Sequence, residues 1–342
     1  MLKIEEILNS NLENLNLLDK KLLIGFSGGG DSTALILAMH ELKKINSKLN
    51  FEAFHVNYGL RKESNKDQKF VEDLCKKLKI KLTVKNFLNE EINFNNKSED
   101  NLRNIRYKLM SSYISKSKLF CVVTAHNLND HVETFIMKLS RGIGMKGMEG
   151  IKEYSIINEF NKLKIYRPLI KIKKNDLFDY CISKNIQPMK DISNLDIKFS
   201  RNRIRNNVIP ELEKLNPDFL NTVNRLTELV KEFNIYQNKS IDKKFDKIKI
   251  VENNEKISFN RNKFNELDNL EKKLILKSKC ESFSPSIFIE SKHLDIILSQ
   301  CLSQKINFSL DMPGPIAVRA TSTEISLIKL ISKWHFIKSC PR

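Results

Sequence analysis

The chain has 342 residues, with 59 Lys and Arg against 41 Asp and Glu, which gives a formal net charge of +18. This length accommodates two or three domains. A surplus of this size attracts polyanions such as nucleic acids, although a general bias toward Lys, Asn and Ile also explains it. The N-terminal residues do not have a secretory signal pattern, no apolar run approaches membrane-spanning length, and the six cysteines form no Cys-x-x-Cys pair. We therefore expect a cytoplasmic protein with no membrane partner.

The first half of the chain alternates short apolar runs with amphipathic helical segments. Strands are expected at residues 22–26, 51–56, 81–87 and 119–124, and helices at 32–45, 64–78, 98–115 and 129–140, with a polar surface loop at 90–100. The alternation predicts an α/β fold with a doubly wound parallel sheet. Ligands bind such sheets at the carboxyl ends of the strands.

The most informative segment connects the first expected strand to the first expected helix. This glycine loop consists of Ser27, Gly28, Gly29, Gly30, Asp31 and Ser32. A strand, a glycine turn and a helix present backbone N–H groups to an anion, and glycines allow close approach of a phosphate. The segment is not a Walker loop, because no Lys follows the glycines. Asp31 repels a phosphate, so its presence in the loop indicates a bridging Mg²⁺.

A second informative stretch follows the strand at 119–124. His126 lies directly after that strand, and Asp130 and Glu133 are spaced to share one face of the next helix. Two carboxylates beside a phosphate loop can hold Mg²⁺ or orient an amine nucleophile. The alternative is an acidic first turn that complements the helix dipole.

The glycine-rich stretch 142–147 matches Gly-x-Gly-x-x-Gly but follows a helix instead of a strand. A dinucleotide site is therefore not expected there. We expect a flexible loop that grips substrate through Arg141 and Lys146.

Arginines are concentrated in two places, where they favour contact with phosphates or planar bases. Arg103 and Arg106 are spaced i, i+3 on an expected helix, where a solvated face is the default interpretation. Arg201 and Arg205 share a helical face, whereas Arg203 points away from it. We expect the second group to contact nucleic acid or a triphosphate.

The C-terminal half becomes helical after residue 168. Helices are expected at 175–184, 203–247 (punctuated by Pro210 and Pro217), 262–279 and 286–299, a linker with some strand character at 248–259, and strands at 305–310, 316–320 and 325–330. This pattern predicts a helical region followed by a small α+β domain.

The glycine loop resembles the pyrophosphate loop, or PP-loop, of the N-type ATP pyrophosphatases. Together with other segments it resembles the tRNA(Ile)-lysidine synthetases, which implies an adenine nucleotide alpha-hydrolase-like fold. Those segments are 55–61 (His-Val-Asn-Tyr-Gly-Leu-Arg), 103–107, 124–134, 141–144, 148–151, 166–169, 191–194 and 201–205. The resemblance covers roughly residues 20–212. One departure is Tyr58, where the family pattern has His.

The resemblance implies a two-step reaction on the wobble cytidine of the CAU anticodon of tRNA(Ile). ATP adenylates the C2 carbonyl oxygen and releases pyrophosphate, and the ε-amine of free L-lysine then attacks C2 and expels AMP. It implies ATP binding by the glycine loop with His55 and Asn57, a Mg²⁺ ion on Asp31, catalysis or lysine binding by Asp31, His126, Asp130, Glu133, Arg106 and Arg205, and tRNA contact by Arg141, Lys146, Arg201 and Arg203. The oligomeric state stays open, with a homodimer as one option.

We expect three regions: a PP-loop catalytic domain at 1–212, a helical tRNA-binding region at 213–250 and a small α+β domain at 251–342. Two alternatives stay open, another PP-loop tRNA-modifying enzyme such as a thiolase and a non-catalytic RNA-binding protein. Sulfur transfer calls for a Cys-x-x-Cys pair or a cysteine beside the glycine loop, and the sequence indicates neither. A non-catalytic protein would be indicated by the loss of Asp31, Asp130 or Glu133, and all three are present.

Overall fold

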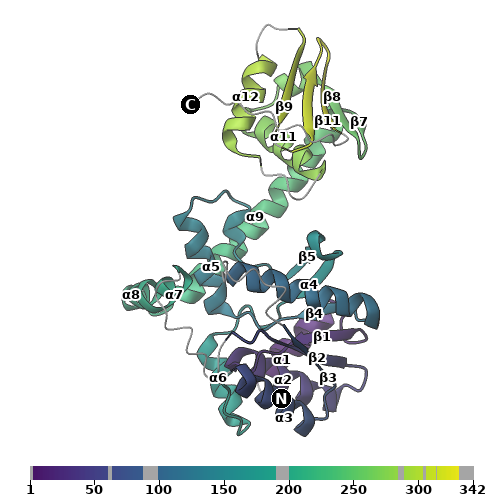
Figure 1. The fold of residues 1–342 in the computed structure, drawn as a ribbon. Helices are drawn as coiled ribbons and strands as arrows, with labels where there is room; N and C mark the ends of the chain where they lie inside the picture. Colours follow the sequence, from purple (N-terminus) through teal and green to yellow (C-terminus); the bar gives the residue numbers. More distant parts are fainter. Residues whose placement is uncertain are drawn as a thin grey trace. The chain divides into compact units, whose positions relative to one another are not determined.

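The computed structural model describes residues 3–60, 64–87, 99–189, 200–283, 289–302, 306–312 and 314–330. Most of the expected 90–100 loop, Arg61 and the segment 191–194 lie outside these ranges. The chain divides into two compact units, Met1–Lys231 and Glu232–Arg342, each with its own sheet (Figure 1). In the described part of the chain, no helix combines the length and apolarity needed to cross a membrane.

The first unit contains a six-stranded sheet in the order β3-β2-β1-β4-β6-β5. Neighbouring strands are parallel except for β5, which is antiparallel to β6. The doubly wound parallel sheet is therefore confirmed, and its strand order reverses at the junction of β1 with β4. The strands are β1 (Lys21–Gly25), β2 (Asn50–Asn57), β3 (Leu82–Asn86), β4 (Cys121–Val123), β5 (Tyr154–Ile157) and β6 (Leu163–Tyr166).

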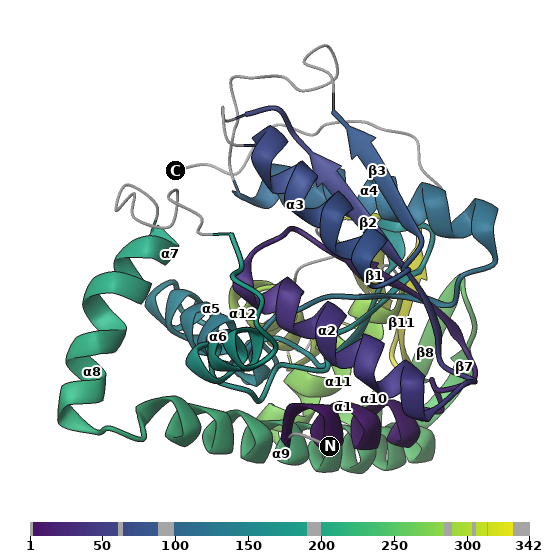
Figure 2. The same ribbon diagram turned by 90° about the horizontal axis from the view of Figure 1, so that it is seen from below.

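Helices cover both faces of this sheet (Figure 2). Side chains alternate along β1, so Leu22 and Ile24 join the core formed with α1, α2 and α6, whereas Leu23 joins Met110 of α4 in a second core. The apolar run of β1 thus reflects burial on both faces. The helices are α1 (Lys3–Asn14), α2 (Gly30–Ile45), α3 (Ser64–Lys77), α4 (Glu99–Ser117), α5 (Leu128–Ser140) and α6 (Lys174–Ser183).

The helical region after residue 200 packs on α5. The expected helix at 203–247 is interrupted: α7 (Ser200–Arg203) continues through a π-helical turn at Ile204–Val208 into α8 (Ile209–Leu215), and α9 (Phe219–Ile248) follows a break. Pro210 lies in the first turn of α8, where a missing N–H is tolerated, and Pro217 lies in the break. Ile204, Ile209 and Leu220 form a core with Val132 of α5.

The second unit is an α+β structure around an antiparallel sheet in the order β7-β8-β11-β10-β9. The expected linker at 248–259 is instead a strand pair, and the expected helix at 262–279 is two helices. Phe245 of α9, Phe259 of β8 and Phe264 of α10 lie in the core. The elements are β7 (Lys249–Glu252), β8 (Lys256–Asn260), α10 (Arg261–Asn265), α11 (Asn269–Phe283), α12 (Ser291–Leu302), β9 (Phe308–Met312), β10 (Ile316–Ala320) and β11 (Glu324–Lys329).

Candidate active site

The glycine loop connects β1 to α2 and is held by its own hydroxyl groups. The Ser27 and Ser32 Oγ atoms lie 3.0 Å apart, and Ser32 Oγ donates to the Gly29 carbonyl at 3.1 Å. Gly28 has φ +90°, and a Cβ there would lie 3.3 Å from Val71 Cγ2, so this turn requires glycine. No side chain caps α2, whose N-cap residue is Gly29. The first N–H groups of α2 are thus oriented for an anion.

Two residues expected to bind ATP support the loop through hydrogen bonds within the protein. His55 is buried, which lowers its pKa, and its Nδ1 lies 2.9 Å from the Phe26 carbonyl oxygen. Because a carbonyl only accepts, the neutral ring carries its proton on Nδ1. Asn57 donates to Gln68 Oε1 at 2.8 Å and accepts from Gly59 N at 2.9 Å. These contacts order the end of β2 beside the glycine loop.

Asp31 lies in the first turn of α2 and has a perturbed carboxyl group. Burial is the main cause of a rise in its pKa to about 6, and the nearby Asp130 carboxylate raises it further. The positive charge of Lys174 lowers the pKa of Asp31 in part. The glycine loop and the acidic pair of α5 therefore meet at one edge of the sheet.

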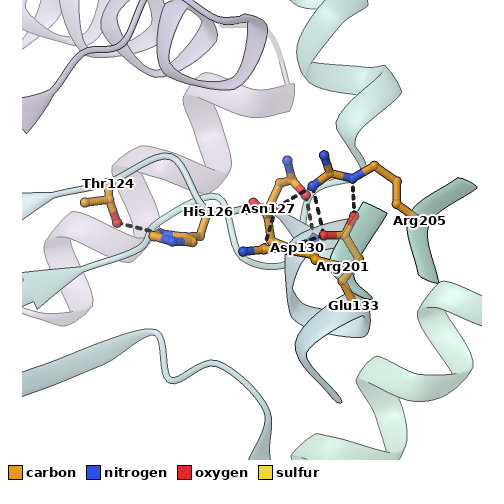
Figure 3. A network of polar contacts seen from close by, with 7 residues as sticks. All are labelled: Thr124, His126, Asn127, Asp130, Glu133, Arg201 and Arg205. Atoms are coloured by element: carbon orange, nitrogen blue, oxygen red, sulfur yellow. Dashed lines mark hydrogen bonds and ion pairs between the residues drawn. The ribbon is translucent and has the colours of Figure 1, made fainter. Parts of the chain in front are cut away.

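The acidic pair of α5 is bound by two of the three arginines in the 201–205 segment, Arg201 and Arg205 (Figure 3). Arg201 donates from Nε to Glu133 at 2.7 Å and from Nη2 to Asp130 at 3.0 Å. Arg205 donates to both oxygens of Glu133, from Nε at 2.6 Å and from Nη2 at 2.9 Å. The shared helical faces are thus confirmed for both pairs, and Arg203 is exposed as expected. The side chain of Glu133 is 1% exposed and that of Asp130 is 17% exposed.

Asp130 also completes a capping box at the start of α5. Its N–H donates to Asn127 Oδ1 at 3.0 Å, and Asn127 N donates to Asp130 Oδ2 at 3.1 Å. Asp130 therefore also stabilises the start of α5, as the alternative interpretation of this acidic residue proposes. The same carboxylate caps the helix and faces the arginines, because its two oxygens point to different partners.

His126 follows β4 and lies among arginines. Its Nδ1 is 2.8 Å from Thr124 Oγ1. Figure 3 shows the two side chains pointing toward each other. Burial lowers the pKa of His126 well below its usual value, and four neighbouring arginines lower it further; in order of effect they are Arg167, Arg106, Arg201 and Arg103. The ring is therefore neutral near pH 7.

Tyr58 replaces the expected His and connects the end of β2 to α4. Its hydroxyl donates to the Leu102 carbonyl at 3.1 Å, and burial raises its pKa. An aromatic ring with a hydroxyl thus fills this position without adding a titratable group near neutral pH. Arg106 lies one turn further along α4.

Arg141 and Lys146 are exposed at the end of α5 and in the loop that follows. They lie outside the ion pairs around Glu133, so the expected grip on substrate stays a prediction. Sequence reasoning was wrong about cysteine, because Cys181 donates from Sγ to the Gly30 carbonyl at 3.5 Å and therefore lies beside the glycine loop. Burial raises the pKa of this thiol to about 12.

Within the described ranges, no group of three or more His, Cys, Asp or Glu side chains could hold a metal ion. Mg²⁺ differs from most metals because one or two carboxylates suffice when substrate phosphates and water complete its coordination. Asp31, half-buried in a phosphate-type loop with Asp130 nearby, fits that chemistry.

A parallel sheet with a glycine turn at its strand-order reversal defines a nucleotide-binding α/β protein. A family model described as a PP-loop domain matches residues 2–212. The chain belongs to this PP-loop family.

Curated relatives carry the name tRNA(Ile)-lysidine synthase. The protein from Clostridium perfringens (strain ATCC 13124) is 34% identical over 287 residues, which are 82% of this chain and 59% of that protein. The protein from Clostridioides difficile (strain 630) is 29% identical over 329 residues, which are 93% of this chain and 69% of that protein. The resemblance found in the motifs is confirmed. The chain spans about 59% of the length of the first of these relatives.

The fold also resembles a solved structure. A U34-tRNA thiolase from Methanococcus maripaludis superposes with a TM-score of 0.57 at 19% sequence identity, covering 67% of this chain and 79% of that one. This likeness supports the PP-loop α/β fold.

Proposed function

We propose that the protein ligates free L-lysine to C2 of the wobble cytidine in the CAU anticodon of tRNA(Ile), in the cytoplasm, with ATP as the second substrate. The observation that carries the proposal is the meeting of the glycine loop, Asp31 and the α5 carboxylates at one sheet edge. The name shared by the relatives suggests the substrates.

In the first proposed step the C2 carbonyl oxygen of cytidine attacks the α-phosphorus of ATP. An oxygen–phosphorus bond forms, the bond between the α-phosphorus and its bridging oxygen breaks, and pyrophosphate leaves. The N–H groups at the start of α2 and the hydroxyls of Ser27 and Ser32 would bind the leaving group. Asp31 would hold Mg²⁺, which neutralises phosphate charge when bound.

In the second proposed step the ε-amine of lysine attacks C2, the C2–oxygen bond breaks, AMP leaves and the amine nitrogen loses a proton. The acidic pair of α5 would bind the ammonium groups of lysine. Asp130 is the more exposed carboxylate, so we assign it the contact with lysine. Glu133 binds Arg201 and Arg205 on both of its oxygens, so we assign it the orientation of these arginines.

The tRNA would reach this edge with its target base unstacked, as single-stranded RNA bases are when proteins read them. Arg141, Lys146 and Arg203 are exposed cations that would contact its backbone. We extend this role to the region from residue 213, where the surplus of Lys supplies further phosphate contacts.

The thiolase alternative depends on a reactive sulfur. Cys181 is the cysteine beside the glycine loop, and its raised pKa keeps it as a thiol at neutral pH. A non-catalytic RNA-binding protein is disfavoured because Asp31, Asp130 and Glu133 are retained and converge on one site.

The test is an incubation of the purified protein with ATP, lysine and a panel of tRNA transcripts, followed by mass analysis of the product nucleosides. We expect lysidine with the CAU tRNA(Ile) transcript alone, and only when both ATP and lysine are present. A thiolated nucleoside formed with a sulfur donor would favour the thiolase. RNA binding without any modified nucleoside would favour the non-catalytic protein.

A further inference from the structure

We propose that Arg106, Arg167 and His126 form a pocket for a phosphodiester of the RNA substrate, next to the target nucleotide. This inference rests on the proposed function, because it takes RNA as the substrate. It assigns a role to Arg167, which the sequence indicated only as part of the Tyr-Arg-Pro-Leu segment.

Arg167 is a buried cation held by neutral groups. It is 8% exposed, and its Nη1 donates to the Lys152 carbonyl at 2.7 Å and to Ser155 Oγ at 3.0 Å. In the described ranges no carboxylate pairs with it, and its buried Nε has no hydrogen-bond partner. Burying a guanidinium without a counter-charge is costly, so these donors are arranged for an anion that binds from outside the protein.

The fold brings Arg167 to His126 and Arg106. Tyr166 pairs with Val123 and accepts a hydrogen bond from Thr124 N at 2.9 Å, so Arg167 follows β6 where the chain turns toward His126 after β4. From the other side, the side chain of Tyr107 in α4 contacts the Arg167 guanidinium. Arg106 precedes Tyr107 and lies over its ring, 5.9 Å from the centroid.

Arg106 and His126 complete the donor set. The buried Nε of Arg106 has no hydrogen-bond partner among the described residues. His126 is neutral, and when its Nδ1 accepts from Thr124 Oγ1 its Nε2–H is left as a donor that adds no positive charge. Two guanidinium forks beside a neutral imidazole match the tetrahedral oxygens of a phosphate ester.

ATP and RNA both carry phosphate esters, and the structure favours RNA. The glycine loop and the start of α2 already offer N–H groups and hydroxyls to a polyphosphate. Three other arginines near the site are paired with carboxylates: Arg201 and Arg205 with Glu133, and Arg103 with Asp100. The pocket thus supplies positive charge where a single phosphodiester beside an unstacked base needs it.

The test measures binding of a CAU anticodon stem-loop RNA in which each phosphodiester flanking the target cytidine is replaced, one at a time, by a neutral methylphosphonate. With the wild-type protein we expect one replacement to weaken binding about tenfold, equivalent to about 1.4 kcal/mol. With Arg106→Gln the unmodified and modified RNAs should bind equally, and Arg167→Gln should behave likewise. Among the described residues the Arg106 side chain donates to no backbone carbonyl, whereas Arg167 donates to that of Lys152, so the Arg106 variant remains informative if Arg167→Gln fails to fold.

Two controls separate the sources of phosphate. Lys44→Gln removes an exposed cation paired with Glu41 and should keep the full methylphosphonate effect. Affinity for a non-hydrolysable ATP analogue should be unchanged in Arg106→Gln. Loss of analogue binding, with the methylphosphonate effect retained, would assign the pocket to ATP and overturn the proposal, as would equal wild-type binding of all RNAs. Because binding is read without turnover, failure to form lysidine would count against the proposed function alone.

Discussion

At the scale of single residues, Asp31 lowers the free energy of unfolding by an amount that depends on pH. Its pKa in the folded protein is about 6, above an ordinary value of 3.8, chiefly because it is buried. Above pH 6 the folded state therefore holds a charged carboxylate at a free-energy cost, and Asp31→Asn should raise the free energy of unfolding by about 2 kcal/mol at pH 8. The gain should shrink as the pH falls through 6 and vanish below about 4. Denaturant unfolding of both proteins across this range measures it.

The same residue should be indispensable to the reaction. Asp31→Ala removes the proposed Mg²⁺ ligand and should abolish AMP formation while the protein stays folded. The measurement is AMP release with tRNA and lysine, alongside a thermal melt. Near-normal turnover by the folded variant would contradict the metal role.

The α5 carboxylates should separate into two roles. Asp130→Asn should raise the KM for lysine at least tenfold with little change in the KM for ATP, because one charge facing the amine is lost. Glu133→Gln should lower kcat as well, because Arg201 and Arg205 lose their shared partner. Steady-state kinetics of the two variants, with the concentrations of lysine and ATP varied in turn, test both predictions. An unchanged response to lysine in Asp130→Asn would exclude the assignment.

At the scale of elements, α5 is tied to the loop after it and to α9 by His131. The ring accepts from Ile151 N at 3.2 Å on Nδ1 and lies 2.9 Å from Thr227 Oγ1 on Nε2. Gly150, with φ +68°, lies against the ring, where a Cβ would be 2.4 Å from His131 Cε1. His131, which lies between Asp130 and Glu133 in the sequence, therefore connects α5 to the following loop and to α9.

Because Gly150 lies against the His131 ring, we expect two alanine substitutions in this loop to differ in their effect on stability. Gly150→Ala should destabilise the protein by about 3 kcal/mol, because the ring is buried and the backbone is left-handed. Gly144→Ala, in the same loop, meets nothing within 4 Å and should change stability by less than about 0.5 kcal/mol. Thermal melts of the two variants compare them directly. Equal melting temperatures would show that the loop moves to accept the methyl group.

Strands and helices that alternate in the first half of the chain were predictable from the sequence, whereas α1 and several short elements were missed. β1 and α2 were found because an apolar run, a glycine turn and a helical run follow one another. β5 and β6 have four residues each and interrupt their apolar side chains with a polar one, Ser155 in β5 and Lys164 in β6, so they were missed. The break between α10 and α11 was missed because Glu266 and Leu267 are good helix formers, and tertiary packing overrides their preference.

The site residues were likewise predictable only where a local sequence pattern indicates them. The glycine loop and the α5 carboxylates carry local spacing that points to their chemistry. The partnership of Glu133 with Arg201 joins residues 68 positions apart, and only the fold reveals it. Arg167 was indicated only as part of the Tyr-Arg-Pro-Leu segment of the resemblance, with no sign of its own role.

At the scale of the whole molecule, we predict that tRNA binding depends steeply on salt and uses α9. Lys239, Lys243 and Lys247 are exposed at i, i+4, i+8 spacing on one face of this helix. Replacing all three by Gln should flatten the slope of log affinity against log salt by about 2. Lys76, Lys77 and Lys79 are exposed at the end of α3, toward the amino ends of the strands, and their replacement is the matched control. Equal slopes for both triple variants would refute a binding role for α9.

The π-helical turn at Ile204–Val208 has a consequence for how this chain tolerates length changes. Such a turn behaves as one extra residue inserted into an α-helix. Removing a single residue there would restore a regular helix and rotate everything before it by about 100° relative to α8. Arg201 would lose its ion pair with Glu133, while Ile209 would stay in the core. The alignment of Arg201 with the carboxylates of α5 thus depends on the number of residues in this turn.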